Sequence, residues 1–339
     1  MKSIGVLVQS LMLSIALVSG GFAIAQTLEE SEAAYELKNY GTAFSGFKRL
    51  SEAGDAIAQN YLSGMYLYGM GVIKDEQQAA AWSRKAADQG NANAQARLGV
   101  MYKNGTGVTK DMQQAAAWYR KSADQENELA QAALGLLYRR GTGVPKDDQQ
   151  AVSWFRKAAE QGNDSAQYWL GEMYAAGRGV PKDDQQAAAW YRMAADQGNA
   201  DAQLDLGVMY QNGAGVVKDE VQAAAWYRKS ADQGNDLAQF VMGTAYFAGT
   251  GVPQNYQQAA VWNRKSADQN NAGAQYSLGL MYFNGWGVPK DAEQAYFWLL
   301  LSSAQGHAIA MENRDVIETT LTTQQRVNAQ ISARNWKPK

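Results

Sequence analysis

The sequence predicts an all-α fold, a solenoid of tandem helix-turn-helix repeats that are each 36 residues long. A Gly-x-Gly-Val pattern returns at a constant interval, and a tryptophan follows each pattern at a fixed distance. The segments between these markers have the periodicity of amphipathic helices. No unit can bury its own Trp and Met side chains, so we expect stacking of neighbouring units to supply the core.

The composition excludes several kinds of function. The 339 residues include 31 basic and 33 acidic residues, a net charge of −2, which gives no basic surface for nucleic acid or an anionic membrane. The chain has no cysteine and one histidine, so thiolate metal sites, disulfides and most His-dependent catalysis are out of reach. We expect no metal, no cofactor and no nucleic-acid partner.

Residues 1–25 are predicted to be a signal peptide. Lys2 precedes a largely apolar run, residues 4–18, and Ala23 and Ala25 supply the small-x-small cleavage pattern. An uncleaved anchor is the alternative, but the run is short for a membrane span and contains Gln9. We expect cleavage near Ala25, no remaining membrane span, and a periplasmic or secreted bacterial protein.

The first helix of each unit carries an apolar face, as at Ala94, Leu98 and Met101. Gly99 inside this helix costs about 1 kcal/mol relative to Ala. Because this glycine recurs, we expect a neighbouring helix to pass very close to it. The recurring positions are Gly135, Gly171, Gly207, Gly243 and Gly279.

A glycine loop and a capped second helix follow. The loops begin at Gly69, Gly105, Gly141, Gly177, Gly213, Gly249 and Gly285. Glycine there can adopt the left-handed conformation that ends a helix. Asp111 and Gln114, three residues apart, predict a reciprocal capping box at the start of the second helix. The pair recurs as Asp75/Gln78, Asp147/Gln150, Asp183/Gln186, Asp219/Gln222, Asn255/Gln258 and Asp291/Gln294.

The second helix buries its tryptophan and, on its opposite face, presents Arg120 and Lys121 to solvent as we interpret the pattern. The series is Trp82, Trp118, Trp154, Trp190, Trp226, Trp262 and Trp298. Glycine ends most of these helices, with Asn270 as a tolerable substitute. Glu126 is the exception, and we expect a distorted turn there.

The ends of the array are atypical, as expected of capping repeats. We predict an N-terminal capping repeat over residues 26–54, seven tandem repeats over 55–306 and C-terminal capping helices over 307–339, which makes nine helix pairs. His307 occupies the N-cap position of its series, which indicates capping and not catalysis.

The repeat unit resembles the sel-one-like repeat (SLR), a relative of the tetratricopeptide repeat. Residues 130–163 and 202–235 are good examples of its A-x-x-x-L-G-x-M-Y-x-x-G-x-G-V pattern with the following D-x-x-Q-A-x-x-W. The resemblance covers nearly the whole mature chain. It implies a right-handed α/α superhelix that acts as an adaptor, with an envelope, signalling or host protein as partner. Some cysteine-rich relatives are linked to penicillin binding or hydrolysis, and this chain lacks their cysteines.

The motifs that look chemical have structural explanations. The glycine loops lack the preceding strand and the spacing of a phosphate-binding loop, so we interpret them as turns. The Asp-x-x-Gln pairs stand at helix starts, where capping explains them. We find no candidate catalytic residue and predict that the protein is not an enzyme.

Positions that differ between repeats predict where a partner binds. In solenoids of this type the first helices line the concave surface, and three differing positions form a stripe along them. Aromatic and Arg side chains anchor interfaces, so the predicted partner-binding residues are Arg139, Arg140, Tyr168, Phe240, Phe247, Tyr276, Phe283 and Trp286. The alternative is that these aromatics pack between adjacent repeats.

The sequence therefore favours an exported scaffold that binds a peptide or protein partner on its concave face. A protein that binds cell-wall glycan or peptidoglycan through the exposed aromatics is one alternative. A hydrolase such as a β-lactamase-like enzyme is another, although the sequence offers no recurrent cluster of ionisable groups for it.

Overall fold

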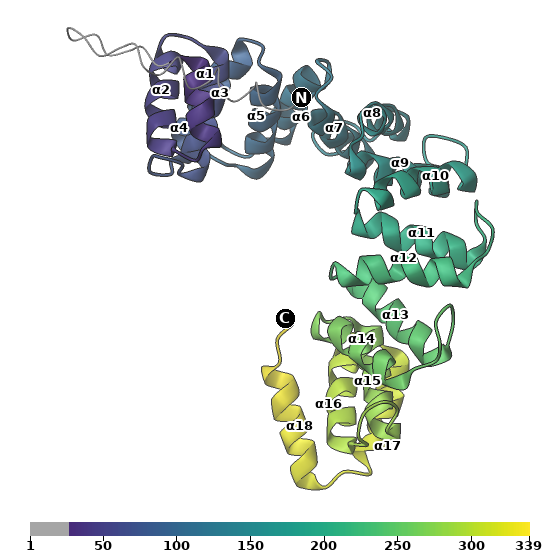
Figure 1. Ribbon diagram of the computed structural model, residues 1–339. Coiled ribbons are helices and arrows are strands. Elements are labelled where there is room, and N and C mark those ends of the chain that lie inside the picture. Colours follow the sequence, from purple (N-terminus) through teal and green to yellow (C-terminus); the bar gives the residue numbers. More distant parts are fainter. Residues whose placement is uncertain (1–26) are drawn as a thin grey trace, which may run out of the picture. The chain divides into compact units, whose positions relative to one another are not determined.

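The computed structural model describes residues 27–339, and within that range every regular element is a helix. The predicted signal peptide, residues 1–25, lies outside the described residues. The described residues divide into two compact units, of which the first ends at residue 110 and the second spans 111–339. Figure 1 labels the helices in chain order.

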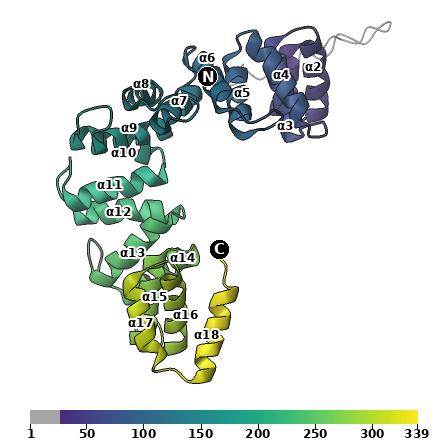
Figure 2. The same cartoon turned by 180° about the vertical axis from the view of Figure 1, so that it is seen from behind.

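The described part of the first unit consists of α1 Leu28–Glu36, α2 Tyr40–Glu52, α3 Ala56–Tyr68, α4 Glu76–Asp88 and α5 Ala92–Asn104. The second unit consists of α6 Met112–Ala123, α7 Glu128–Arg140, α8 Asp148–Glu160, α9 Asp164–Ala176, α10 Asp184–Asp196, α11 Ala200–Asn212, α12 Glu220–Asp232, α13 Asp236–Ala248, α14 Tyr256–Asp268, α15 Ala272–Asn284, α16 Ala292–Ala304, α17 Ala308–Glu318 and α18 Thr323–Asn335. Within each unit, successive helices pack against one another, which Figure 2 shows from behind. This arrangement confirms the predicted all-α solenoid of helix pairs.

The Asp residues cap the second helices as predicted, but their Gln partners do not complete the capping box. The Asp183 carboxylate accepts the N–H groups of Gln185 and Gln186, each at 3.0 Å. The N–H of Asp183 itself donates to the Tyr174 carbonyl at 3.0 Å, so no free donor remains for the Gln186 side chain. The predicted reciprocal box is therefore wrong at this position. At Thr322 and Gln325 both halves form.

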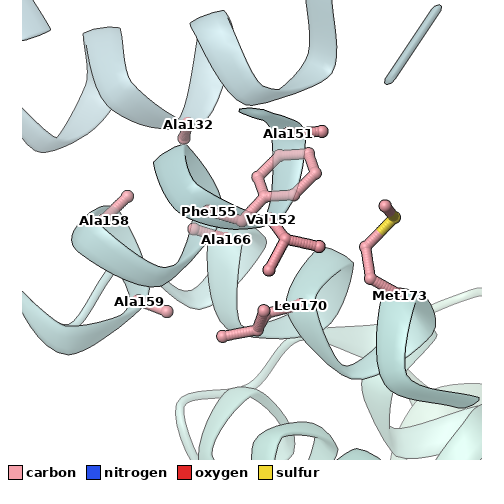
Figure 3. Close-up of a cluster of buried hydrophobic side chains, with 9 residues drawn as sticks. All are labelled: Ala132, Ala151, Val152, Phe155, Ala158, Ala159, Ala166, Leu170 and Met173. Atoms are coloured by element: carbon pink, nitrogen blue, oxygen red, sulfur yellow. The ribbon is translucent and has the colours of Figure 1, made fainter. Parts of the chain in front are cut away.

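The helix glycines lie against the second helix of their own repeat, as predicted. A Cβ on Gly207 would lie 2.6 Å from the Tyr227 ring, and one on Gly171 would lie 2.7 Å from the Tyr191 ring. The ring opposite Gly135 is that of Phe155. Figure 3 shows Phe155 packed among Ala132, Ala151, Leu170 and Met173. The absence of a side chain at the glycine therefore leaves the space that the ring of the second helix occupies.

The first full repeat makes the same contact with two serines in place of the glycine and the ring. Ser63 of α3 takes the place of the glycine, and Ser83 of α4 takes the place of the ring. Their buried hydroxyl oxygens lie 2.7 Å apart, and Ser63 also donates to the Ala79 carbonyl. The volume added on one helix is removed from the other.

The Arg–Lys pairs differ from the solvated face that the sequence predicts. Arg120 is half-buried, because its guanidinium lies 5.0 Å from the centre of the Trp154 ring of the next repeat and donates to the Tyr138 hydroxyl. Lys121 is exposed, with its ammonium group 4.0 Å from the centre of the Trp118 ring. These cations cover the tryptophans and contribute to packing between repeats.

The turn at Glu126 keeps the hydrogen bonds of the glycine turns, although α6 ends one residue earlier than the other second helices. Its φ of 64° is the left-handed conformation that glycine adopts at the equivalent positions, and Asn270 has a φ of 72°. The N–H of Glu126 donates to the Ala123 carbonyl at 3.1 Å, as that of Gly234 donates to Ala231 at 3.0 Å. Glu126 stands where other repeats have glycine, and it adopts the glycine conformation at the cost of backbone strain at this one residue.

Candidate functional site

The differing positions of α7, α9, α11, α13 and α15 lie on one side of each of these first helices, and we call this side the first-helix face. It is represented here by Arg139, Glu172, Gln211, Thr244 and Phe283. The eight predicted binding residues fall into a polar group on α7 and α9, an aromatic group near the end of α13, and side chains that pack between repeats.

The polar group contains an ion pair that lies beside an aromatic ring. The guanidinium of Arg139 lies 2.8 and 2.7 Å from the two carboxylate oxygens of Glu172, and 4.3 Å from the centre of the Trp169 ring. Arg178 lies on the other side of the same carboxylate, at 3.8 Å. Arg140, the neighbour of Arg139, is exposed at the end of α7.

Tyr168 lies on the same helix as Glu172 and beside the carboxylate of Asp205, a residue that the sequence analysis missed. Its ring lies 5.7 Å from the ring of Tyr191, and its hydroxyl lies close enough to Asp205 of α11 to influence the pKa of that carboxyl. The pKa of Asp205 is raised to about 6, first by burial and to a smaller extent by the charges of Asp201 and Glu172, while the Tyr168 hydroxyl acts in the opposite direction. Burial, followed by the charge of Asp205, also raises the pKa of Tyr227, to about 12.

A comparison of repeats one position away from the predicted stripe would have found Asp205. The equivalent residues are Tyr61, Arg97, Ala133, Trp169, Val241 and Ser277, so this position carries a charge in only two repeats. Asp205 is partly buried and forms no ion pair with any residue in the described range 27–339. A buried charge without a counter-charge costs stability and is therefore a candidate for function.

The aromatic group consists of Phe247, Tyr256 and Trp286. The Phe247 ring centre lies 5.1 Å from that of Tyr256 and 5.2 Å from that of Trp286. Tyr256 and Trp286 each remain 37% exposed. The group thus joins adjacent repeats and also offers ring surface to solvent. The sequence analysis missed Tyr256.

Three other predicted residues take part in packing. Tyr276 stacks on His307 with ring centres 4.8 Å apart, and its hydroxyl accepts from Asn313 at 3.4 Å. His307 caps α17 as predicted, through Nδ1 and the N–H of Ala310. Phe240 packs against the cluster around Leu278. Phe283 is partly buried, with Lys290 5.5 Å from its ring centre.

A cavity of about 290 Å³ opens between α11, α12 and α13. Its apolar wall comes from Ala223, Phe240, Val241 and Ala245, while Gln211 and Thr244 bring predicted stripe positions to it. Tyr227 also lines the cavity and donates its hydroxyl proton to Gln211 at 2.7 Å. The volume lies at the lower end of ligand pockets, roughly 300–1,000 Å³, which suits one or two side chains.

A series of buried glutamines, which the sequence analysis also missed, joins consecutive repeats. The Gln203 amide donates to the Ala195 carbonyl of the preceding repeat at 3.0 Å and accepts from Gln233 of its own repeat at 2.8 Å. The same bonds recur at Gln131, Gln167, Gln239 and Gln275. The recurrence of Gln after the helix alanine was the available signal, and it marks structure, because each amide both donates to and accepts from groups within the array.

Two kinds of site are absent from the part of the chain that the structure describes. No group of three or more His, Asp or Glu side chains in it could hold a metal ion. Between residues 27 and 339, no helix has the length and apolar character needed to cross a membrane.

Comparisons with known proteins identify the repeats. The model of the Sel1 repeat matches residues 56–91, 92–127, 129–163, 164–199, 200–235, 236–271 and 272–307. Among curated proteins, no match to the chain is found.

Two solved structures are similar over most of the chain. The Sel1 repeat protein from Oxalobacter formigenes is 37% identical with a TM-score of 0.67, covering 84% of this chain and 86% of that one. The protective antigen c5321 of uropathogenic Escherichia coli strains, which displays an SLR fold, is 30% identical with a TM-score of 0.57, covering 91% of this chain and 84% of that one. Seven matched repeats and these two relatives together show that the chain belongs to the Sel1 repeat family.

Proposed function

We propose that this chain is an exported scaffold that binds a peptide or protein partner on its first-helix face. Sel1 repeat proteins are generally scaffolds for protein–protein interaction. The observation that carries the proposal for this chain is the contrast between its repeated and its differing positions. Caps, glycines, tryptophans and glutamines repeat and build the frame, whereas Arg139, Tyr168, Phe247 and Trp286 differ from their counterparts and remain at least partly accessible.

Two residues of the aromatic group near α13, together with the predicted residue Phe283, offer the direct test. Replacing Phe247, Phe283 and Trp286 together with Ala should reduce capture of native envelope partners by the tagged mature protein at least tenfold, because exposed aromatics anchor interfaces. The matched control replaces Tyr66, Tyr102 and Tyr138, which lie on the first helices of other repeats, with Phe. Unchanged capture by the triple Ala variant, with its circular dichroism spectrum intact, would remove the support for this face.

Export is proposed from the N-terminal sequence alone. Lys2, the apolar run and the small residues Ala23 and Ala25 support it. The mass of the protein purified from a bacterial periplasm should correspond to a chain that starts at Gln26. Recovery of the full-length chain in the cytoplasm would contradict export without affecting the binding proposal.

A further inference from the structure

Arg97 of α5 is a partly buried cation that forms no ion pair with any residue in the described range 27–339. Its Nη1 atom donates to the carbonyl of Asn60 in α3, and it has no other hydrogen bond within that range. Burial, opposed by Tyr68 and Tyr35, lowers the pKa of the Arg97 guanidinium, which nevertheless stays protonated at neutral pH. The folded chain thus holds a partly desolvated charge and supplies no counter-charge for it.

The guanidinium lies where α3 lacks a side chain. A Cβ added to Gly64 would lie 3.2 Å from Nη1, 3.5 Å from Nη2 and 3.6 Å from Cζ of Arg97. Both residues are exceptions among the repeats. At the position of Gly64 the other repeats carry a side chain, in Val100, Leu136, Glu172, Val208, Thr244 and Leu280. At the position of Arg97 none of the others is basic, and they carry Tyr61, Ala133, Trp169, Asp205, Val241 and Ser277.

The contact with Asn60 leaves most donors of Arg97 unused. A guanidinium carries five N–H groups, and one nitrogen of Arg97 is bonded to the Asn60 carbonyl. Nε and Nη2 have no partner in the part of the chain that the structure describes, and neither atom is sealed from solvent. A ligand can therefore reach these donors without displacing a group of the protein.

Charge and geometry select a carboxylate as the ligand. The planar fork of an arginine fits the two oxygens of a carboxylate, and the pairing is stronger where water is partly excluded. The second unit shows the same chemistry within the chain, because the Arg139 guanidinium lies 2.8 and 2.7 Å from the two oxygens of Glu172. In α3 the position of that glutamate is occupied by Gly64, so the carboxylate for Arg97 has to come from another molecule.

We propose that Arg97, together with the space beside Gly64, binds the side-chain carboxylate of an aspartate or glutamate in an extended segment of a partner protein. The inference rests on the proposed scaffold function and adds a site in the first unit that the predicted binding residues did not include. Gly64 and Arg97 lie inside α3 and α5 and not at the ends of these helices. A segment that crosses both helices meets the guanidinium with a side chain and not with its terminus.

The experiment is selection of random dodecapeptides displayed on phage, with the folded mature protein as bait and prior removal of phage that bind Arg97→Gln. Enriched sequences should share one acidic position. A synthetic peptide from this set should bind Arg97→Gln at least about tenfold more weakly than the wild type, because a charge-assisted hydrogen bond is lost. A peptide with the amide in place of the shared acidic residue should lose the same factor against the wild type and nothing further against Arg97→Gln.

Two matched controls separate this contact from general electrostatics. Lys48→Gln removes one positive charge from an exposed position of α2 in the same unit, and the dissociation constant should stay within about twofold of the wild type. Amidation of the peptide C-terminus should also leave the dissociation constant within about twofold, because the carboxylate that binds belongs to a side chain.

A substitution within the chain tests the same contact without a ligand. Gly64→Glu places a carboxylate beside Arg97, whereas Gly64→Gln adds a side chain of the same length without a charge, and the flexible end of Arg97 can shift to admit either. Gly64→Glu should unfold at a higher urea concentration than Gly64→Gln, because its charge is paired. In an Arg97→Gln background the two should unfold at the same urea concentration. Gly64→Glu should also weaken binding of the selected peptide at least about tenfold, since the site is then occupied.

Each outcome has a separate meaning. Enriched peptides without an acidic residue, no enrichment at all, or a peptide that loses its affinity on C-terminal amidation would overturn this inference. Equal urea midpoints of Gly64→Glu and Gly64→Gln in the wild-type background would overturn it as well. All of these results leave the scaffold proposal standing, because that proposal is measured separately, by capture of envelope partners with the wild type and the aromatic variant.

Discussion

At the scale of single residues, Asp205 is a carboxylate that lowers the stability of the chain at neutral pH. Burial raises its pKa in the folded state to about 6, above the value of roughly 3.9 in an unfolded chain. Its contribution to stability is therefore fully present below about pH 4 and is lost as the pH rises through 6. The full difference is on the order of 2–3 kcal/mol.

Asp205→Asn should accordingly raise the free energy of unfolding at pH 7.5 by about 1–2 kcal/mol, since the amide has no charge to bury. Near pH 4.5, where Asp205 is protonated in the folded chain, the difference between the two proteins should shrink to less than about 1 kcal/mol. Urea denaturation followed by circular dichroism at both pH values measures this. A variant less stable than the wild type at pH 7.5 would show that Asp205 has a stabilising partner.

Glu126 is a second residue whose local conformation costs stability. A side chain at a φ of 64° has a strain of about 1 kcal/mol that glycine avoids. Glu126→Gly should therefore increase the free energy of unfolding by up to about 1 kcal/mol. The reverse change at an equivalent turn, Gly162→Glu, should decrease it by a similar amount, because Gly162 has a φ of 99°. Equal stabilities of Glu126→Gly and the wild type would contradict the strain.

At the scale of helices, the pairing of glycine with a ring sets how closely two helices approach. Gly207→Ala should lower the free energy of unfolding by about 1–3 kcal/mol, because the added carbon would lie 2.6 Å from the Tyr227 ring. Gly41 is also helical but has no atom within 4 Å of an added Cβ. Gly41→Ala should be neutral or stabilising by up to about 1 kcal/mol. Thermal denaturation of the two variants makes the comparison, and equal effects would contradict the steric explanation.

The buried glutamines hold neighbouring helix pairs together. Gln203→Ala should cost about 2–3 kcal/mol, because it removes two buried hydrogen bonds and leaves a void. Its partner Gln233 is exposed, and Gln233→Ala should cost less than about 1 kcal/mol. Urea denaturation distinguishes the two. If both variants lost similar amounts of unfolding free energy, the stabilisation would come from the Gln–Gln hydrogen bond and not from the burial of Gln203.

The helices, their ends and the close glycines could be predicted from the sequence, because each depends on residues within one repeat. Three of the failures share one cause, which is contact between segments that the sequence does not show to be neighbours. The Asp183 N–H is used by the Tyr174 carbonyl, Arg120 lies beside Trp154, and Asp205 lies beside Tyr168 of the preceding repeat. The candidate site is built mostly from such contacts, so its residues were only partly foreseen.

At the scale of the molecule, an array in which each repeat contacts only its neighbours should lose stability locally. Phe47 is fully buried in the cluster around α2 and α3, and Phe47→Ala should cost about 3–5 kcal/mol there. Hydrogen exchange should accelerate in α1–α4, while α13–α18 keep their protection. Uniform acceleration along the whole chain would instead show that the array unfolds as a single cooperative body.

The second glycine of each loop has a consequence for how such a chain can change its length. Gly215, with a φ of 69°, lies directly against the Asp184 carbonyl at the start of the preceding second helix, and Gly251 lies against Glu220 in the same way. A residue inserted into one loop would move this glycine off its carbonyl. Duplication of a whole unit such as 200–235 would recreate the contact at both new junctions. Growth of the gene by complete units, and not by single codons, is what this geometry permits.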